Sequence, residues 1–256
     1  MISFGAGVMY AIPTFDSTGA AVAPALALEP PVQFGDMQDG SVDMSFEEKL
    51  LYGSRKFPIA VGQGKGKISG KVKVARFNGP MFGSLFLGNP GLAGMRAVVP
   101  DFQAVIPATP FQVTVTPPAS GTFTTDLGVI DVTTGRALIK VASAPTAGQY
   151  SVSAGGQYTF AAADTGKSVL LNYEYTATST VARRGTITND LMGYTPGFGC
   201  VIAVTYQGQQ VEFNFPNCVA SKFSFPTKND DFTIPEFEFS VFAGAGGVVG
   251  TWAMAE

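Results

Sequence analysis

The stretch Gly62–Phe77, GQGKGKISGKVKVARF, decides how the first part of the chain folds. Its glycines and lysines look at first like a phosphate-binding loop, but the spacing is wrong for one and no helix pattern follows. Instead, side chains alternate with a period of two, which is typical of a β-strand with one polar and one apolar face. The polar face carries Lys65, Lys67, Ser69, Lys71 and Lys73, and the apolar face carries Ile68, Val72 and Val74. The stretch therefore predicts a strand, in which the glycines mark a bulge or the close approach of another backbone.

The residues before this strand predict a partner for it. From Asp39 onward one parity is acidic, with Asp43 and Glu47, and the other parity is apolar. Residues 48–62 then mix apolar and basic side chains, and two strands joined by such a segment are typical of an extended hairpin. Its tip holds more apolar residues than a solvated loop should, namely Leu50, Leu51, Tyr52, Phe57, Ile59 and Val61.

Composition predicts a mainly β fold. The chain has 256 residues, with 31 glycines and 21 phenylalanines but 1 tryptophan, and helical patterns are few. The main helix is expected over 78–88, where Asn78 and Pro80 suit a helix start and Gly88 suits its end. Its apolar stripe at helical spacing is Met81, Phe82, Leu85 and Phe86.

The positions of prolines and turn residues divide the chain into three segments. Prolines recur between residues 100 and 118, and short strands with turn signals continue to about residue 180. Phenylalanine alternation then marks the last strands, as at Phe237 and Phe239. We expect residues 1–107 and 181–256 to form the two parts of a β-sandwich or barrel with one flanking helix. Residues 108–180 are expected to form a smaller β-sandwich domain, inserted or added.

Charges are few but sorted along the chain, although the net charge is only −3. Residues 36–48 hold five acids and no base, residues 49–76 hold eight bases and no acid, and residues 230–256 hold five acids and no base. One interpretation is a cross-strand ladder within one chain. Another is complementarity between copies, with intersubunit candidates Lys65, Lys67, Lys71, Lys73, Glu236 and Glu238. A DNA-binding patch ranks last, because the lysines lack interleaved aromatics.

The search for reactive groups finds little. The chain has no histidine, which removes Ser-His-Asp and Cys-His nucleophiles and most zinc sites. Cys200 and Cys218 form no CxxC motif and are expected to be buried reduced thiols. Asp230 and Asp231 fit a solvated turn better than a metal site. We therefore expect no enzyme, no catalytic residue, no metal, no cofactor and no membrane span.

Three long segments together resemble the major tail tube proteins of tailed bacteriophages. They are QFGDMQDGSVDMSFEEKLLYG at 33–53, FPIAVGQGKGKISGKVKVARFNGPMFGSLFLG at 57–88, and residues 187–243 from ITNDLMGY to EFSVFA. The run GQYSVSAGGQYTFAAADTGKSVLLNYEY at 148–175 is similar to β-sandwich modules added to many phage virion proteins. The long segment at about 108–180 departs from the tail tube pattern.

The resemblance implies a structural virion protein of the phage tail, assembled in the host cytoplasm. Copies of it would form hexameric rings that stack into a tube for DNA passage. Implied partners are further copies, tape measure, tail terminator and baseplate or tip proteins. Asp39, Asp43 and Glu47 are lumen-lining candidates, since an acidic wall lets phosphate slide. The tip residues Leu50, Leu51, Tyr52, Phe57 and Ile59 are candidates for joining rings.

Two alternatives remain open at this stage. One is another β-rich virion component, such as a head decoration or tail terminator protein. The other is a carbohydrate- or cell-surface-binding module in the middle of the chain. That module requires aromatic side chains on an exposed face, and the candidates are Tyr150, Tyr158, Tyr173 and Tyr175, for which core packing is the competing interpretation.

Overall fold

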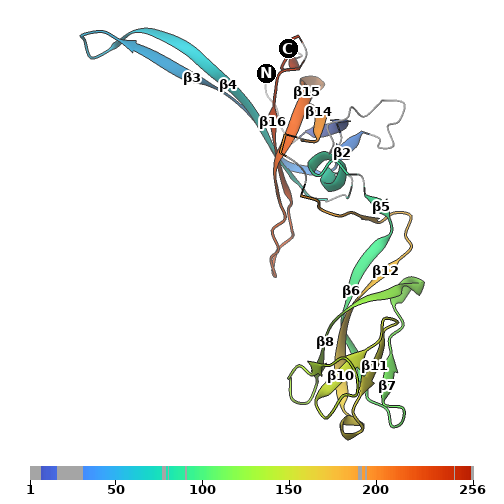
Figure 1. Cartoon of the computed structure of the whole chain (residues 1–256). Coiled ribbons are helices and arrows are strands. Elements are labelled where there is room, and N and C mark those ends of the chain that lie inside the picture. Colours follow the sequence, from blue (N-terminus) through green and yellow to red (C-terminus); the bar gives the residue numbers. More distant parts are fainter. Residues whose placement is uncertain are drawn as a thin grey trace. The chain divides into compact units, whose positions relative to one another are not determined.

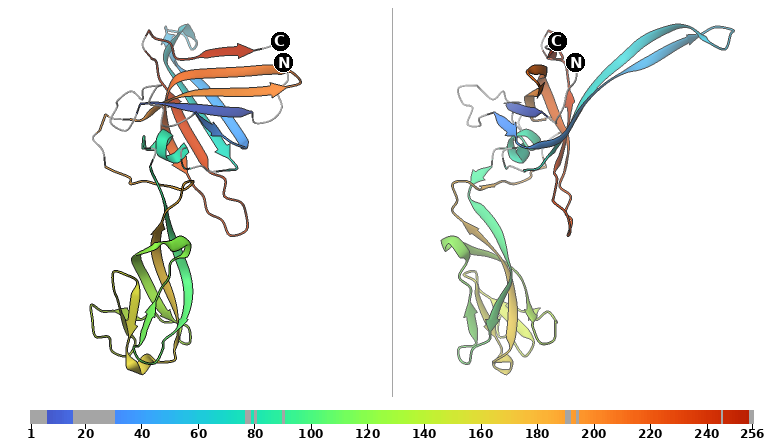
Figure 2. Two further views of the ribbon diagram at one scale, coloured as in Figure 1. Left: turned by 90° about the vertical axis from the view of Figure 1, so that its right-hand side faces the viewer. Right: turned by 180° about the vertical axis from the view of Figure 1, so that it is seen from behind.

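The computed structural model describes residues 7–15, 31–76, 79, 81–89, 91–189, 192–193, 195–244 and 246–254. Contacts divide the chain into two compact units, shown in Figures 1 and 2. Unit 1 comprises Met1–Gly91 and Gly185–Glu256, and unit 2 comprises Leu92–Arg184. The fold is mainly β with antiparallel sheets, as expected from composition.

Unit 1 is built on one antiparallel sheet with the strand order β2-β1-β14-β15-β16-β4-β3, and β17 pairs with β15 beside that path. The first four strands of the chain are β1 (Val8–Phe15), β2 (Val32–Phe34), β3 (Met37–Tyr52) and β4 (Pro58–Val74). The last four are β14 (Gly197–Tyr206), β15 (Gln209–Ser224), β16 (Glu236–Val241) and β17 (Thr251–Met254). Strands from both ends of the chain therefore share one sheet.

The core of unit 1 lies inside the curl of this sheet. Phe34 on β2 meets Phe237 on β16 with ring centroids 5.3 Å apart, although three strands separate β2 from β16 along the sheet. Phe198 on β14 contacts both Phe237 and Phe239 at about 6 Å. The alternating phenylalanines thus face inward, as expected. Cys200 and Cys218 are free thiols buried in the same core, which confirms that expectation.

The expected helix is present as η2, a π-helix over Met81–Phe86. Met81 and Leu85 are buried in the core, and the rings of Phe82 and Phe86 lie 5.1 and 6.1 Å from Phe223 on β15. The residues of the apolar stripe therefore pack against the core, as their helical spacing predicts. The expected capping residues Asn78 and Pro80 lie outside the described residues.

Unit 2 is a small sandwich of two sheets around its own core. One sheet has the order β6-β12-β8, and the other has the order β7-β11-β10-β9. The strands are β6 (Met95–Val105), β7 (Gln112–Thr114), β8 (Thr122–Asp131), β9 (Ile139–Lys140), β10 (Gln149–Val152), β11 (Gln157–Phe160) and β12 (Ser168–Ala177). Two short 3-10 helices, Pro118–Ser120 and Ala162–Asp164, complete the unit.

The boundary of unit 2 differs from the expected segment 108–180. Strand β6 lies before residue 108, yet it pairs with β12 from Met95↔Ala177 to Val105↔Ser168. The prolines after residue 105 therefore mark turns inside unit 2 rather than its entrance. The chain enters and leaves unit 2 through a short strand pair, β5 (Leu92–Ala93) with β13 (Arg183–Arg184).

The four tyrosines named as candidates for an exposed binding face are buried. Tyr150, Tyr158, Tyr173 and Tyr175 all belong to the core of unit 2 and are at most 6% exposed. Their period of two places them on the inward faces of β10, β11 and β12. Core packing is therefore the correct interpretation for these residues, and they do not form a carbohydrate platform.

Candidate functional site: the β3–β4 arm

Strands β3 and β4 form a hairpin much longer than the sheet that holds it. They pair from Met37↔Val74 at the base to Tyr52↔Pro58 at the tip. Strand β16 covers β4 only from Ile68 to Lys73. Within the described part of the chain, residues 44–67 therefore form a ribbon of two strands, which leaves the sheet of unit 1 in Figures 1 and 2. We call residues 44–67 the arm.

The arm exposes an unusual number of large apolar side chains. Phe57 is 81% exposed and Ile59 is 70% exposed. The other exposed apolar residues of the arm are Met44, Phe46, Leu50, Leu51, Tyr52 and Val61. Contiguous apolar surface of this kind marks an interaction site, and a hairpin of two strands is only marginally stable alone in water. The five tip candidates Leu50, Leu51, Tyr52, Phe57 and Ile59 are thus brought together at the exposed end.

Both faces of the arm are apolar near its tip. Leu50 lies opposite Val61, and the next pair along the ribbon is Leu51 with Ala60. Successive pairs of a ribbon point to opposite faces, so each face of the tip carries an apolar pair. A strand that covers a core needs only one apolar face. An arm with two such faces is suited to being enclosed by another molecule.

The glycines of the opening stretch make room for aromatic rings. A Cβ at Gly70 would lie 2.1 Å from the ring of Phe239, and a Cβ at Gly66 would lie 2.9 Å from the ring of Phe46. Both glycines are on the apolar face of β4, at the register positions opposite Val42 and Phe46. The glycines therefore serve close packing inside a strand, and the stretch is not a phosphate-binding loop.

The sorted charges form a ladder across four strands of unit 1. Lys73 pairs with Asp39 on β3 at 3.4 Å, and Lys71 pairs with Glu236 on β16 at 2.9 Å. Lys222 on β15 continues the ladder, at 3.5 Å from Glu236 and at 3.1 Å from Glu238 on β16. The hydrogen bond from Lys71 holds the pKa of Glu236 below its usual value, and the hydrogen bond to Glu238 raises the pKa of Lys222.

This ladder involves four of the six residues named as candidates for contacts between copies. Lys71, Lys73, Glu236 and Glu238 already have partners within one chain, so the alternative interpretation of a cross-strand ladder holds for them. The parity of the lysines predicted a charged face, but only the strand register identifies the partners. Lys65 and Lys67 lie on the arm, and neither forms a salt bridge among the described residues.

The three lumen-lining candidates differ in their surroundings. Asp39 belongs to the ladder, and Asp43 lies on the same face of β3, near the hydroxyl of Ser41. Glu47 lies where the pairing slips between Phe46 and Glu48, next to Gly64. The face that carries Asp39 and Asp43 is thus shared by acids and lysines, and it is more nearly neutral than acidic.

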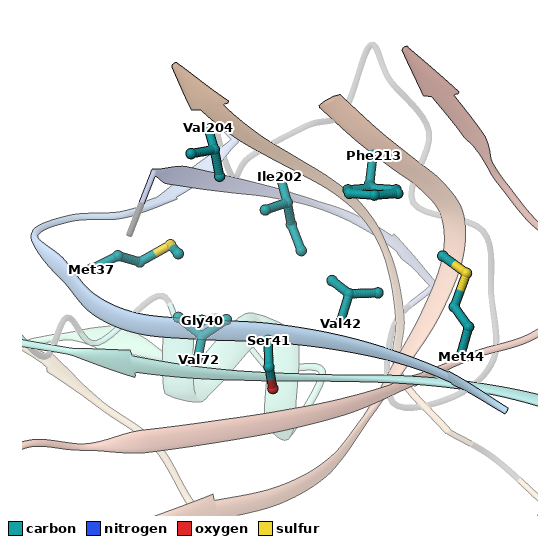
Figure 3. A pocket seen from close by; sticks show the side chains of 9 residues that line it. All are labelled: Met37, Gly40, Ser41, Val42, Met44, Val72, Ile202, Val204 and Phe213. Carbon is teal, nitrogen blue, oxygen red and sulfur yellow. The ribbon is translucent and has the colours of Figure 1, made fainter. Parts of the chain in front are cut away.

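A cavity that no local pattern of residues predicts lies between β3 and the β14–β15 hairpin. Its volume is about 350 Å³, and Figure 3 shows the side chains that line it. They are Met37, Val42, Met44, Val72, Ile202, Val204 and Phe213, with Gly40 and Ser41. The cavity exists because the sheet curls, which brings β3 opposite strands that are far from it in sequence. Its lining offers apolar contact and no titratable group.

The buried ionisable groups of unit 2 serve its structure. The Asp126 carboxylate accepts hydrogen bonds from the hydroxyls of Tyr150 at 2.8 Å and Tyr158 at 3.0 Å, and it pairs with Lys140 at 3.0 Å. Burial opposes the charged form of Asp126, but these bonds and one from the Gly128 amide outweigh burial and lower its pKa. Burial together with Asp126 raises the pKa of both tyrosines. The network ties β8 to the opposite sheet.

Comparison with known proteins gives no assignment, since no protein-family model matches the chain and no curated protein matches its sequence. In the part of the chain that the structure describes, no group of three or more acidic, cysteine or histidine side chains is placed to hold a metal ion. No helix among those same residues is long and apolar enough to span a bilayer.

Proposed function

We propose that the chain is a structural virion subunit, the major tail tube protein of a tailed phage. Copies of it self-assemble into rings, and the rings stack into a tube through which DNA passes. The observation that carries the proposal is the arm, whose exposed apolar residues on both faces call for another molecule to cover them. The number of six subunits in a ring rests on the resemblance alone.

The ladder of charges supports a tube through which DNA passes without being bound tightly. Duplex DNA carries one negative charge per ~1.7 Å of its axis, so a wall of unpaired lysines would hold it tightly. On the face that bears Asp39, the lysines at 71, 73 and 222 are each paired with a carboxylate. If this face lines the lumen, as proposed for Asp39, Asp43 and Glu47, DNA meets a surface with little net charge.

The separate core of unit 2 is compatible with this function. A unit with its own core can be carried outside a tube without interrupting the sheet of unit 1. Another β-rich virion component, such as a head decoration or tail terminator protein, would share that property and stays the second candidate. The binding-module alternative loses support because its four tyrosines are buried.

Negative-stain electron microscopy of the purified protein tests the proposal. We expect stacked rings or tubes as the protein concentration rises, and light scattering should report the same growth in mass. Tubes distinguish a tail tube protein from a terminator or decoration protein, which should stop at single rings or smaller oligomers. A species that stays monomeric at high concentration, over low and high salt, would overturn self-assembly through the arm.

A further inference from the structure

The loop that joins β15 to β16, residues 225–235, is a second protrusion of unit 1. Phe232 in this loop is 87% exposed, and Asp230 and Asp231 follow one another just before it. Lys228 pairs with Asp231 at 3.1 Å within the loop. Figure 2 shows the loop leaving the sheet on its own, between β15 and β16.

The arm tip and this loop lie at opposite ends of the same strand. Strand β4 begins at Pro58, directly after the tip, and it ends at Val74. The loop leads into Glu236, the first residue of β16, which pairs with Lys73 at the far end of β4. A strand rises about 3.3 Å per residue, so the 17 residues of β4 separate the two protrusions by roughly 50 Å.

The two ends are complementary in charge and alike in exposing aromatic rings. The tip carries Lys49, Arg55 and Lys56, and no acid occurs between residues 49 and 76. The loop carries Asp230 and Asp231 beside the exposed Phe232, and its one base is Lys228, so two acids and one base give it a net charge of −1. Contact between two tips would bring bases together, and contact between two loops would bring acids together. Like charges facing each other are unfavourable, so opposite ends are the favoured pair.

We propose that the arm tip of one copy docks on loop 225–235 of a second copy. This inference rests on the proposed function and specifies the partner surface of the arm. The contact is heterologous, because two different surfaces meet, and each copy keeps one free tip and one free loop. Such a contact does not close on itself between two copies, and where it repeats along an axis it joins each ring to the next, as stacked rings require. Phe57 and Phe232 would be buried together, with Arg55 and Lys56 beside the two aspartates.

Cysteine crosslinking tests the contact directly. Cys200 and Cys218 are buried and should not react, so the variants Lys56→Cys and Asp231→Cys each add one accessible thiol. Under mild oxidation of assembled protein, the double variant should give a ladder of covalent oligomers, whereas each single variant should stay monomeric on denaturing gels. Dimers of Lys56→Cys alone would show tips meeting tips, and absence of the ladder in a double variant that assembles would show a different acceptor. Either result overturns the inference.

Charge reversal gives an independent readout. Arg55→Glu with Lys56→Glu, or Asp230→Lys with Asp231→Lys, should raise the concentration needed for assembly about tenfold or more, because like charges then face each other. The combined fourfold variant should assemble as the wild type does. Wild-type assembly by the loop variant, or no rescue in a folded fourfold variant, overturns the loop as acceptor and leaves the proposed function standing. A wild type that never assembles overturns both.

Discussion

Replacing Phe57 with aspartate separates a docking role of the arm from a folding role. Phe57 is 81% exposed in the single chain, so its ring contributes little to the stability of that chain. We expect Phe57→Asp to fold normally and to lose assembly. Leu50→Asp is a less clean variant, because Leu50 is only 43% exposed and packs in a pair with Val61.

The size of the effect follows from the exposure. Full burial of a phenylalanine side chain is worth roughly 1.5–3 kcal/mol. Since four fifths of the ring is exposed in the single chain, about 1.2–2.4 kcal/mol becomes available only on docking. At 1.4 kcal/mol per factor of ten, losing that burial weakens each contact about 7- to 50-fold. An aspartate buried without a partner adds a further cost of several kcal/mol, as an order of magnitude.

The assay compares sedimentation and negative-stain images of Phe57→Asp with those of Ile187→Asp. Ile187 is 71% exposed, lies in unit 1 and is outside the arm, so it is a matched control. The melting temperature of both variants should stay close to that of the wild type. If Phe57→Asp lowers the melting temperature and still forms tubes, the tip folds back on its own chain and the docking argument is refuted. Equal loss of assembly in both variants would show that the effect is not specific to the arm.

Four further predictions follow. Replacing residues 92–184 with a short Gly/Ser linker should leave unit 1 folded and able to assemble, as circular dichroism and microscopy would show; loss of soluble protein would mean that unit 1 depends on unit 2. Gly70→Ala should destabilise unit 1 by about 1–3 kcal/mol in urea unfolding, because the new methyl group meets the ring of Phe239. Gly62→Ala serves as its control, because a Cβ there meets only the Lys49 carbonyl oxygen, at the ordinary contact distance of 4.0 Å. The pKa of Asp126 is lower in the folded state than in the unfolded state, so its contribution to stability is present above about pH 4 and is lost as pH falls through the folded pKa. Asp126→Asn should therefore have a lower free energy of unfolding at neutral pH. Its free energy of unfolding should also change less with pH on the acid side. Lys71→Glu should cause a small loss of stability that a second change, Glu236→Lys, largely restores.

Local pattern predicted the elements well, and the reason is visible in particular residues. The period of two in β4 and the helical spacing of Met81 and Leu85 each reflect one buried face, which a single segment of sequence records. The exposed apolar tip was likewise evident from Leu50, Leu51 and Phe57. Such features need no knowledge of distant parts of the chain.

Features that depend on distant partners could not be predicted in the same way. The pairing of Lys71 with Glu236 requires the register of β4 against β16, and these strands are far apart in sequence. The cavity beside Val42 requires the curl of the sheet. The entrance to unit 2 was misplaced because β6 is separated from the rest of its unit by prolines, which are a local signal for a boundary. Asp230 and Asp231 were expected in a solvated turn. The local sequence could not show that this turn lies at the end of β4 opposite the arm tip, because that depends on the pairing of β16 with β4.

The short strand pair of β5 with β13 makes the protein a natural scaffold for exchange of modules. Arg183 lies opposite Ala93 and Arg184 opposite Leu92, so the chain leaves unit 2 beside the point where it enters. Any folded module whose own termini are adjacent could be spliced in at these positions with little strain on the flanking sheet. Evolution could replace unit 2 while unit 1 stays constant, and a protein engineer could display an antigen or an enzyme once per chain.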